Sequence, residues 1–329
     1  MSSSSRPEPG SATPPHLDVT ELEQVEEILE HTPSRAERAL GERALAAERR
    51  PGLRTAAWAA PGGAWLGFYL LAPIVMIVLV SFWTPTLTGF SKHWTLDNYR
   101  TLFGDSTYWN NMLTSFENSL ITVVVCLLLG FPVAYFLAIK VQNLRNQIAF
   151  FIVALAPFWT SYIIRAVAWQ YPLMGRQGAV NQLLAKLGIG TQEWLAFSRW
   201  AVIIAIVQLY VLFMVTPLFF MLAQVDRSSL ESARDLGANT LQTFREVILP
   251  QSMPGIVIGS IFIFVLTMGE YGTVKIVGGG QVASVGIIIE NQVTGLQLPT
   301  GAASSVILVL AMMAGVFVLL RLSNLREEL

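Results

Sequence analysis

The chain has 329 residues, of which 53% are hydrophobic and 13% are charged, and its formal net charge at pH 7 is −1. Soluble domains carry about 25% charged residues, so this composition, with a mean hydropathy of +0.54, excludes an ordinary soluble protein and predicts one that crosses a membrane several times. The balanced charge argues against nucleic-acid binding. The single cysteine, Cys126, leaves no partner for a disulfide within these residues.

Two segments of different character precede the first apolar run. Residues 1–18 are rich in Ser and Pro and are expected to be disordered. In residues 19–57, Thr20–Glu23 and Ser34–Glu37 have the Ser/Thr-x-x-Glu spacing of a capping box, which predicts two short amphipathic helices on the cytoplasmic side. This region contains no apolar core of the length that a secretory signal needs, so the first membrane span is expected to be retained.

The remainder, residues 58–329, is predicted to be one transmembrane domain. A spanning helix needs about 20 mostly apolar residues, and the sequence offers about six such runs. The expected fold class is therefore an all-α membrane protein with a cytoplasmic N-terminal helical extension. The runs are Gly62–Trp83, Ser119–Ile139, Ile148–Trp169, Ala201–Leu222, Gly255–Val277 and Ala303–Leu322.

The orientation follows from the loops, because short cytoplasmic loops collect Lys and Arg. Basic residues gather before the first span, between spans two and three, between spans four and five, and after the sixth. This distribution places both termini in the cytoplasm, together with the segment that joins spans four and five. The basic residues are Arg43, Arg49, Arg50, Arg54, Lys140, Arg145, Arg227, Arg234, Arg245, Arg321 and Arg326.

The segment between spans four and five, residues 226–252, has its own helix signals. Ser228 and Glu231 have capping-box spacing, so a helix is expected to begin with Ser228 as its N-cap and Glu231 at its third position. Gly237 is expected to end this helix, since glycine adopts the left-handed conformation without strain. Asn239-x-x-Gln242 then predicts the start of a second helix, which a proline closes before the fifth span.

The same segment carries a family pattern. It reads Glu231-Ser232-Ala233, then Gly237, then Val247-Ile248-Leu249-Pro250. This resembles the cytoplasmic docking loop of ABC importer permeases, in which Glu-Ala-Ala is followed by a glycine and by Ile-x-Leu-Pro at the same spacing. Ser232 and Val247 are the two departures from that pattern.

Three stretches are similar to the spermidine/putrescine-type permease subunits within this family: "ESARDLGANTLQTFREVILPQSMPGI", "PFWTSYIIRAVAW" and "GEYGTVKIVGGG". The resemblance extends from about Pro61 to Leu325. It implies the type I importer permease fold in a bacterial inner membrane, with a second permease subunit, usually a different chain, as partner. It also implies two ATPase copies that bind ATP and Mg, and a periplasmic solute-binding protein.

On this resemblance, the chain forms half of a solute pathway and contacts an ATPase through the docking loop. Polyamines are the first candidate solutes, and an amino acid, an opine or a small anion is the alternative. The residues that the resemblance assigns to ATPase docking are Ser228, Glu231, Ser232, Ala233, Asp235, Gly237, Leu249 and Pro250.

Polar side chains inside the spans are the candidates for pathway or gating roles, because a charge costs about 3 kcal/mol there. Glu270 either pairs with Arg165 or remains free to attract a cationic solute. Aromatic walls would favour a cation. The candidates within the spans are Arg165, Trp169, Tyr210, Glu270 and Tyr271. Glu290 and Asn291, in the amphipathic stretch Ser284–Thr294 before the last span, are candidates for the mouth of the pathway.

The sequence lacks the Gly-x-x-x-x-Gly-Lys-Ser/Thr pattern of ATP-binding loops, so the chain is expected to be a non-catalytic subunit without a cofactor of its own. Its three histidines have no metal-ligand spacing. A secondary carrier is the alternative in the transporter class, but the repeats typical of such carriers are not evident. A membrane-embedded enzyme would need convergent reactive groups that the spans do not supply.

Overall fold

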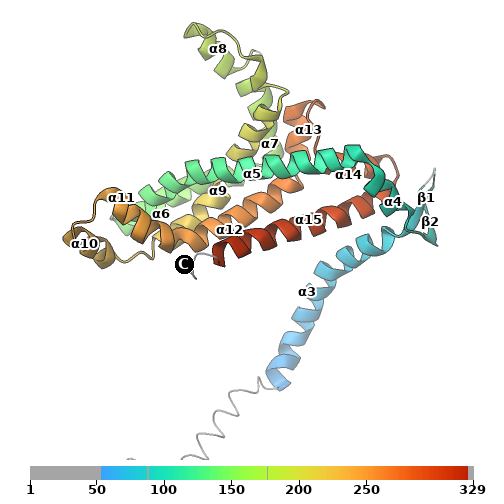
Figure 1. The fold of residues 1–329 in the computed structure, drawn as a ribbon, viewed down its shortest axis with the longest axis horizontal. Helices are drawn as coiled ribbons and strands as arrows, with labels where there is room; N and C mark the ends of the chain where they lie inside the picture. Colours follow the sequence, from blue (N-terminus) through green and yellow to red (C-terminus); the bar gives the residue numbers. More distant parts are fainter. Residues whose placement is uncertain (1–52, 87–88, 176, 325–329) are drawn as a thin grey trace, which may run out of the picture. The chain divides into compact units, whose positions relative to one another are not determined.

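The computed structural model describes residues 53–86, 89–175 and 177–324, and these are almost entirely helical (Figure 1). The expected tail over residues 1–18 and most of the two amphipathic helices lie outside the described residues. The chain divides into two compact units, residues 1–72 and 73–329. Helix α3 (Leu53–Val80) runs across the boundary between them.

The described elements follow one another as helices, with one small hairpin. Their order after α3 is β1 (Trp83–Thr86), β2 (Gly89–Trp94), α4 (Asp97–Gly104), α5 (Ser106–Tyr135), η1 (Phe136–Lys140), α6 (Leu144–Leu155), η2 (Ala156–Trp159), α7 (Tyr162–Ala168), η3 (Trp169–Met174), α8 (Ala179–Lys186), η4 (Glu193–Leu195), α9 (Arg199–Leu222), α10 (Arg227–Asp235), α11 (Thr240–Thr243), η5 (Phe244–Ile248), α12 (Leu249–Met268), α13 (Gly272–Gly278), α14 (Val285–Thr294) and α15 (Leu298–Asn324).

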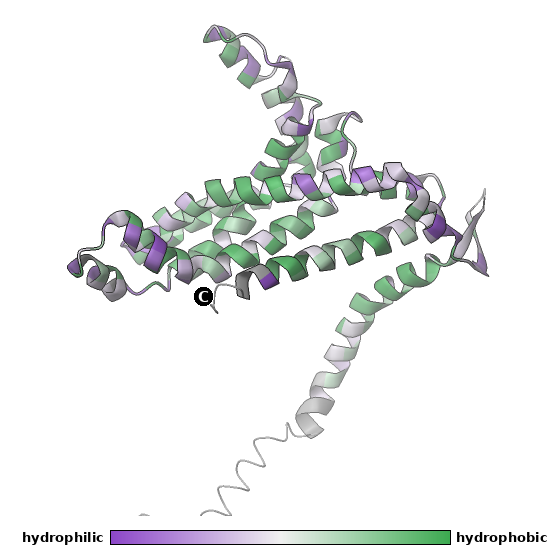
Figure 2. Ribbon diagram, viewed as in Figure 1, coloured by the Kyte–Doolittle hydropathy of each residue, from purple (hydrophilic) through white to green (hydrophobic). Residues whose placement is uncertain are grey.

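Within the described residues, 5 helices are long and apolar enough to cross a membrane, and a bent pair makes a possible sixth span. This confirms the expected all-α membrane fold with about six spans. Hydrophobic residues cover the long helices, whereas hydrophilic residues gather at the α10–α11 end and around the hairpin (Figure 2).

Two of the predicted spans are not continuous helices, so the predicted runs Ile148–Trp169 and Gly255–Val277 are wrong in that respect. The helical axis bends by 84° between Trp159 and Tyr162, because the residues between them are extended, with ψ near 137°. The second run breaks after Met268, where two glycines flank Glu270-Tyr271. Glycine lowers helix stability enough to permit such a break.

The second span begins earlier than its apolar run, at Ser106 rather than Ser119. The carboxylate of Asp105 caps α5 by accepting a hydrogen bond from the Thr107 backbone N–H at 2.8 Å. The first three turns are polar in sequence, yet Tyr108 is fully buried and donates its hydroxyl to the Ser304 carbonyl of α15 at 3.0 Å. Contacts inside the protein, rather than with lipid, hold this part of α5.

The core lies where α9 packs between α5 and α12. Of the spans in the second unit, α9 has the largest buried share, 56% of its apolar window, against 28% to 39% for the others. Met214 on α9 is fully buried between two glycines, Gly130 on α5 and Gly259 on α12. A Cβ at Gly259 would lie 2.7 Å from the Met214 Sδ and 3.1 Å from its Cα, and one at Gly255 would lie 2.9 Å from the Pro217 carbonyl oxygen.

The spacing Gly255-x-x-x-Gly259 puts both glycines on one face of α12, and small residues at this spacing let helix backbones approach closely in a membrane. We expect Gly259→Val to lower the free energy of unfolding by about 1–3 kcal/mol, because the added carbons overpack the contact with Met214. Unfolding in detergent by a denaturant titration measures the change.

Gly67→Val is the matched control, since no heavy atom lies within 4 Å of the position a Cβ would occupy at Gly67. Equal destabilisation by the two variants would contradict the close packing of α12 on α9.

Candidate functional site: the docking loop and the polar groups of the spans

Helix α10 begins two residues earlier than its sequence signals predict. The N-cap is Asp226, whose Oδ1 accepts the Ser228 backbone N–H at 3.1 Å and whose Oδ2 accepts the Ser228 hydroxyl at 2.7 Å. The prediction of Ser228 as N-cap is therefore wrong, because the preceding carboxylate is the stronger acceptor. As a result, Glu231 lies in the second turn of α10 and not at its third position. Its side chain is exposed to solvent.

Both hydrogen bonds from Ser228 lower the pKa of Asp226 below the ordinary value for this carboxyl. The hydrogen bond from the Ser228 side chain has the larger effect, and the one from its backbone N–H has the smaller. A lowered pKa means that the cap stabilises the helix start above the ordinary Asp pKa and that this contribution is lost as the pH falls through the lowered value. The cap is therefore intact at neutral pH.

The turn between α10 and α11 has the expected geometry. Gly237 has φ of +81°, and the Ala238 N–H donates to the Ala233 carbonyl at 3.0 Å, as in a glycine-terminated helix end. Asn239 and Gln242 then form a complete capping box, with hydrogen bonds of 2.8 and 2.9 Å. Both predictions, the glycine stop and the second helix start, are confirmed.

The second helix does not end at Pro250. Helical residues continue from Thr240 to Met268, a span of 29 residues. The π-helical turn η5 (Phe244–Ile248) directly precedes α12, of which Pro250 is the second residue. From Thr240 onward, the docking loop therefore continues into α12 as helix.

Most of the predicted docking residues are accessible. Ala233 and Leu249 are half-buried, and the exposed ones are Ser228, Glu231, Ser232, Asp235, Gly237 and Pro250. Sequence reasoning missed Leu236 and Leu241, which are 88% and 73% exposed at the turn. The feature of the sequence that could have indicated these contact residues is an isolated leucine on each side of Gly237.

A cavity of about 1180 Å³ lies beneath the docking loop, between it and the ends of α5 and α9. Its lining combines apolar side chains with Lys140 and Glu231. The loop, at the α10–α11 end of the bundle, and the ends of α5 and α9 thus face one another across this cavity (Figure 1).

A second group of predicted residues meets where α12 breaks. Tyr210 on α9 donates its hydroxyl to Glu270 Oε2 at 2.5 Å, and Glu270 Oε1 accepts the Thr273 N–H at 2.8 Å. The Tyr162 hydroxyl of α7 also lies at this break, because a Cβ at Gly272 would lie 3.0 Å from it and 3.6 Å from Glu270 Oε1. We call Tyr162, Tyr210 and Glu270 the junction cluster.

The hypothesis that Glu270 pairs with Arg165 is wrong, because Glu270 takes its hydrogen bonds from Tyr210 and Thr273 instead. The Arg165 guanidinium lies 5.6 Å from the centre of the Phe158 ring, and its Nε is buried without a hydrogen-bond partner in the described part of the chain. Trp169 packs half-buried against the core of α9 and α13, and Tyr271 is 46% exposed.

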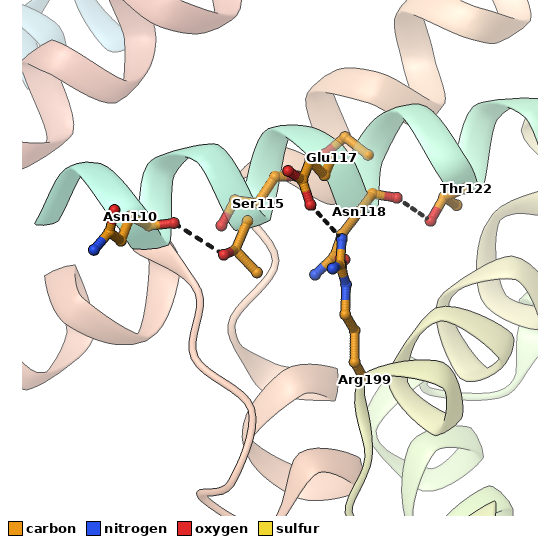
Figure 3. Close-up of polar contacts among 8 residues, drawn as sticks. Asn110, Ser115, Glu117, Asn118, Thr122 and Arg199 are labelled. Atoms are coloured by element: carbon orange, nitrogen blue, oxygen red, sulfur yellow. Dashed lines mark hydrogen bonds and ion pairs between the residues drawn. The ribbon is translucent and has the colours of Figure 1, made fainter. Parts of the chain in front are cut away.

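Polar contacts also join helix ends on the side of the spans away from the docking loop. Arg199 at the start of α9 donates to Asn118 Oδ1 at 2.6 Å and forms an ion pair of 2.8 Å with Glu117, both on α5 (Figure 3). Glu290 on α14 forms an ion pair of 2.8 Å with Lys275 on α13, whereas Asn291 is exposed.

The structure brings Tyr210 and Glu270 together, leaves Arg165 beside Phe158, and joins Glu290 to α13. Among the described residues, no group of three or more His, Cys, Asp or Glu side chains could hold a metal ion.

Comparison with known proteins identifies the family. Residues 115–327 match the model of the family "Binding-protein-dependent transport system inner membrane component". The chain belongs to this family. It is therefore an ABC importer permease subunit, a multi-pass inner-membrane protein with a transport role.

The permease is 36% identical over 267 residues to the spermidine/putrescine transport system permease protein PotB of Escherichia coli strain K12, covering 80% of this chain and 96% of PotB. Its fold is similar to a crystal structure of a bacterial ABC transporter for the polysaccharide alginate, with a TM-score of 0.59, 19% identity, and 82% and 94% of the two chains covered.

A second structure of a bacterial alginate transporter, in complex with an alginate-bound periplasmic protein, matches with a TM-score of 0.57 and 18% identity over 80% and 91% of the chains. The family match and the identity to PotB confirm the resemblance to importer permeases.

Asn239→Ala removes one half of the capping box at α11, and such a change typically costs about 1 kcal/mol. We expect the backbone amides of α11 to exchange hydrogen about five times faster in this variant, which hydrogen–deuterium exchange of the purified permease measures. Asn239→Asp, which keeps a capping oxygen, is the matched control and should retain protection. Unchanged exchange in Asn239→Ala would show that the cap does not order the loop.

Proposed function

We propose that this permease forms half of the pathway of an ATP-driven polyamine importer, with spermidine and putrescine as the first candidate solutes. The observation that carries the proposal is the 36% identity to PotB, which extends over 96% of that spermidine/putrescine permease. A second permease subunit, two ATPase copies that hold ATP and Mg, and a periplasmic solute-binding protein complete the assembly. The alternative is an importer of the same architecture for an amino acid, an opine or a small anion.

The docking loop contacts the ATPase from the cytoplasmic side in this proposal, and both chain termini lie on that side. Two features of the loop support the role. The turn presents Leu236 and Leu241 to solvent, and exposed apolar side chains rimmed by polar residues are typical of protein contact sites. The loop also continues into α12 as one helix, so a displacement of the turn would move the span with it.

In the proposed mechanism, closure of the two ATPases displaces the docking loop, and the helices attached to it move between inward-open and outward-open arrangements. Glu231, Ala233 and Gly237 transmit the force. Leu249 and Pro250 lie in the continuous helix and carry the displacement into α12.

The test of the solute assignment is ATP hydrolysis by the complete complex in proteoliposomes, with a panel of solutes offered through the binding protein. We expect spermidine or putrescine to stimulate hydrolysis and to be taken up, because the relative that this chain matches over 96% of its length is a spermidine/putrescine permease. Stimulation by an amino acid, an opine or an anion, and by no polyamine, would overturn the polyamine assignment and leave the importer role in place.

The coupling role of the loop is tested at Gly237, whose φ of +81° suits glycine. Gly237→Val places a β-branched residue in the left-handed region at a cost of about 1–2 kcal/mol, which would displace the turn. We expect uptake to fall while ATP hydrolysis and membrane insertion persist. The assay compares solute transported per ATP hydrolysed.

Gly237→Asn is the matched control, because asparagine tolerates the left-handed conformation, and it should remain coupled. Glu231→Lys, which reverses the exposed charge in the second turn of α10, should also uncouple the complex. Wild-type uptake in both Gly237→Val and Glu231→Lys would contradict the lever mechanism.

A further inference from the structure

The break between α12 and α13 exposes backbone groups that a continuous helix would pair. Inside a membrane such groups must find partners within the protein. The Glu270 side chain provides such a partner, because its Oε1 accepts the Thr273 N–H at 2.8 Å. The backbone oxygen of Glu270 finds its own partner in the Ser284 hydroxyl, from which it accepts a hydrogen bond at 3.3 Å. Its backbone N–H donates to the Thr267 carbonyl at 3.2 Å. One residue thus connects α12, α13 and the start of α14.

The side chain of Glu270 also connects this break to α9. Tyr210 donates to Oε2, the carboxylate oxygen that does not bind Thr273. Glu270 is 8% exposed. Each carboxylate oxygen therefore has a protein donor, and the side chain is enclosed by the elements that it joins.

The surroundings of the break leave little room for another arrangement. A Cβ at Gly272 would lie 3.0 Å from the Tyr162 hydroxyl of α7. A Cβ at Gly286 of α14 would lie 3.1 Å from the Glu270 backbone oxygen. At the other end of α13, Gly279 has φ of +56°, and a Cβ there would lie 2.1 Å from the Phe197 ring. Helix α13 is therefore closely packed at both ends.

We infer that Glu270 is a positioning residue, which fixes α13 against α9 and α14 through its acceptor oxygens, and that it is not the counter-ion of a cationic solute. A counter-ion would need a carboxylate oxygen that is free to contact the solute. Glu270 instead has a protein donor on each carboxylate oxygen, and its side chain is buried.

Glu270→Gln separates the two roles, because glutamine keeps an oxygen that accepts from Thr273 and an amide that can bind the Tyr210 oxygen, but has no charge. The experiment uses the complete complex and measures two quantities. One is hydrogen–deuterium exchange of the α13 amides without solute. The other is uptake of radiolabelled spermidine in proteoliposomes. The inference rests on the proposed importer role, but the exchange measurement needs no solute.

We expect Glu270→Gln to retain the exchange protection of α13 and at least about half of the uptake, since both contacts remain possible. Glu270→Ala should lose both, with exchange faster by about tenfold, the effect of losing one buried hydrogen bond to a charged group. Tyr210→Phe should give faster exchange in the same helix. Tyr69→Phe is the matched control, because no hydrogen bond of the Tyr69 hydroxyl occurs in the part of the chain that the structure describes.

The inference is overturned if Glu270→Gln loses uptake as fully as Glu270→Ala while α13 exchange stays at the wild-type rate in both, since uptake would then require the charge. If Glu270→Ala does not assemble, Glu270→Gln and Tyr210→Phe decide, and wild-type exchange in Tyr210→Phe would overturn the inference. If the wild-type complex takes up no spermidine, the polyamine assignment fails, and the exchange comparison still decides the role of Glu270.

Discussion

The contact of Met214 with two glycines is the constraint on which the second unit depends. Lipid tails are as apolar as leucine, so burying apolar surface does not drive helices together within a bilayer, and close packing must do so. Gly130 and Gly259 let α5 and α12 approach Met214 from different sides, which places α9 at the centre of the bundle. Tyr210 lies one turn before Met214 on α9, so the same packing brings its hydroxyl to the break in α12.

The spans are continuous near the docking loop and interrupted away from it. Thr240 to Met268 is one unbroken helical stretch that starts in the loop, whereas both breaks, after Trp159 and after Met268, lie farther along their spans. The junction cluster occurs where these interrupted segments meet α9. A broken helix requires side chains to satisfy its backbone, which explains why the polar residues of the spans gather there.

Local signals were sufficient to predict much of the fold and the loop. The apolar runs identify the spans, and Gly237 and the Asn239–Gln242 pair specify the turn because their effects act within a few residues. The N-cap of α10 was misassigned although the contact that decides it is local, because Asp226 and Ser228 are both good caps and lie only two residues apart. The early start of α5 was missed for a different reason, since Tyr108 is buried by α15, which is distant in sequence.

The prediction that Arg165 pairs with Glu270 is wrong because it depends on how the helices are oriented, which the sequence alone does not specify. Both residues are charged and buried to some degree, and pairing them would satisfy each. The rotation of α7 and α9 about their axes decides which side chain faces the break, and it presents Tyr210 rather than Arg165. The Tyr210 hydroxyl satisfies one carboxylate oxygen of Glu270, and the Thr273 N–H satisfies the other. In our proposal the carboxylate therefore serves the fold of the break, and solute selection depends on other groups of the assembly.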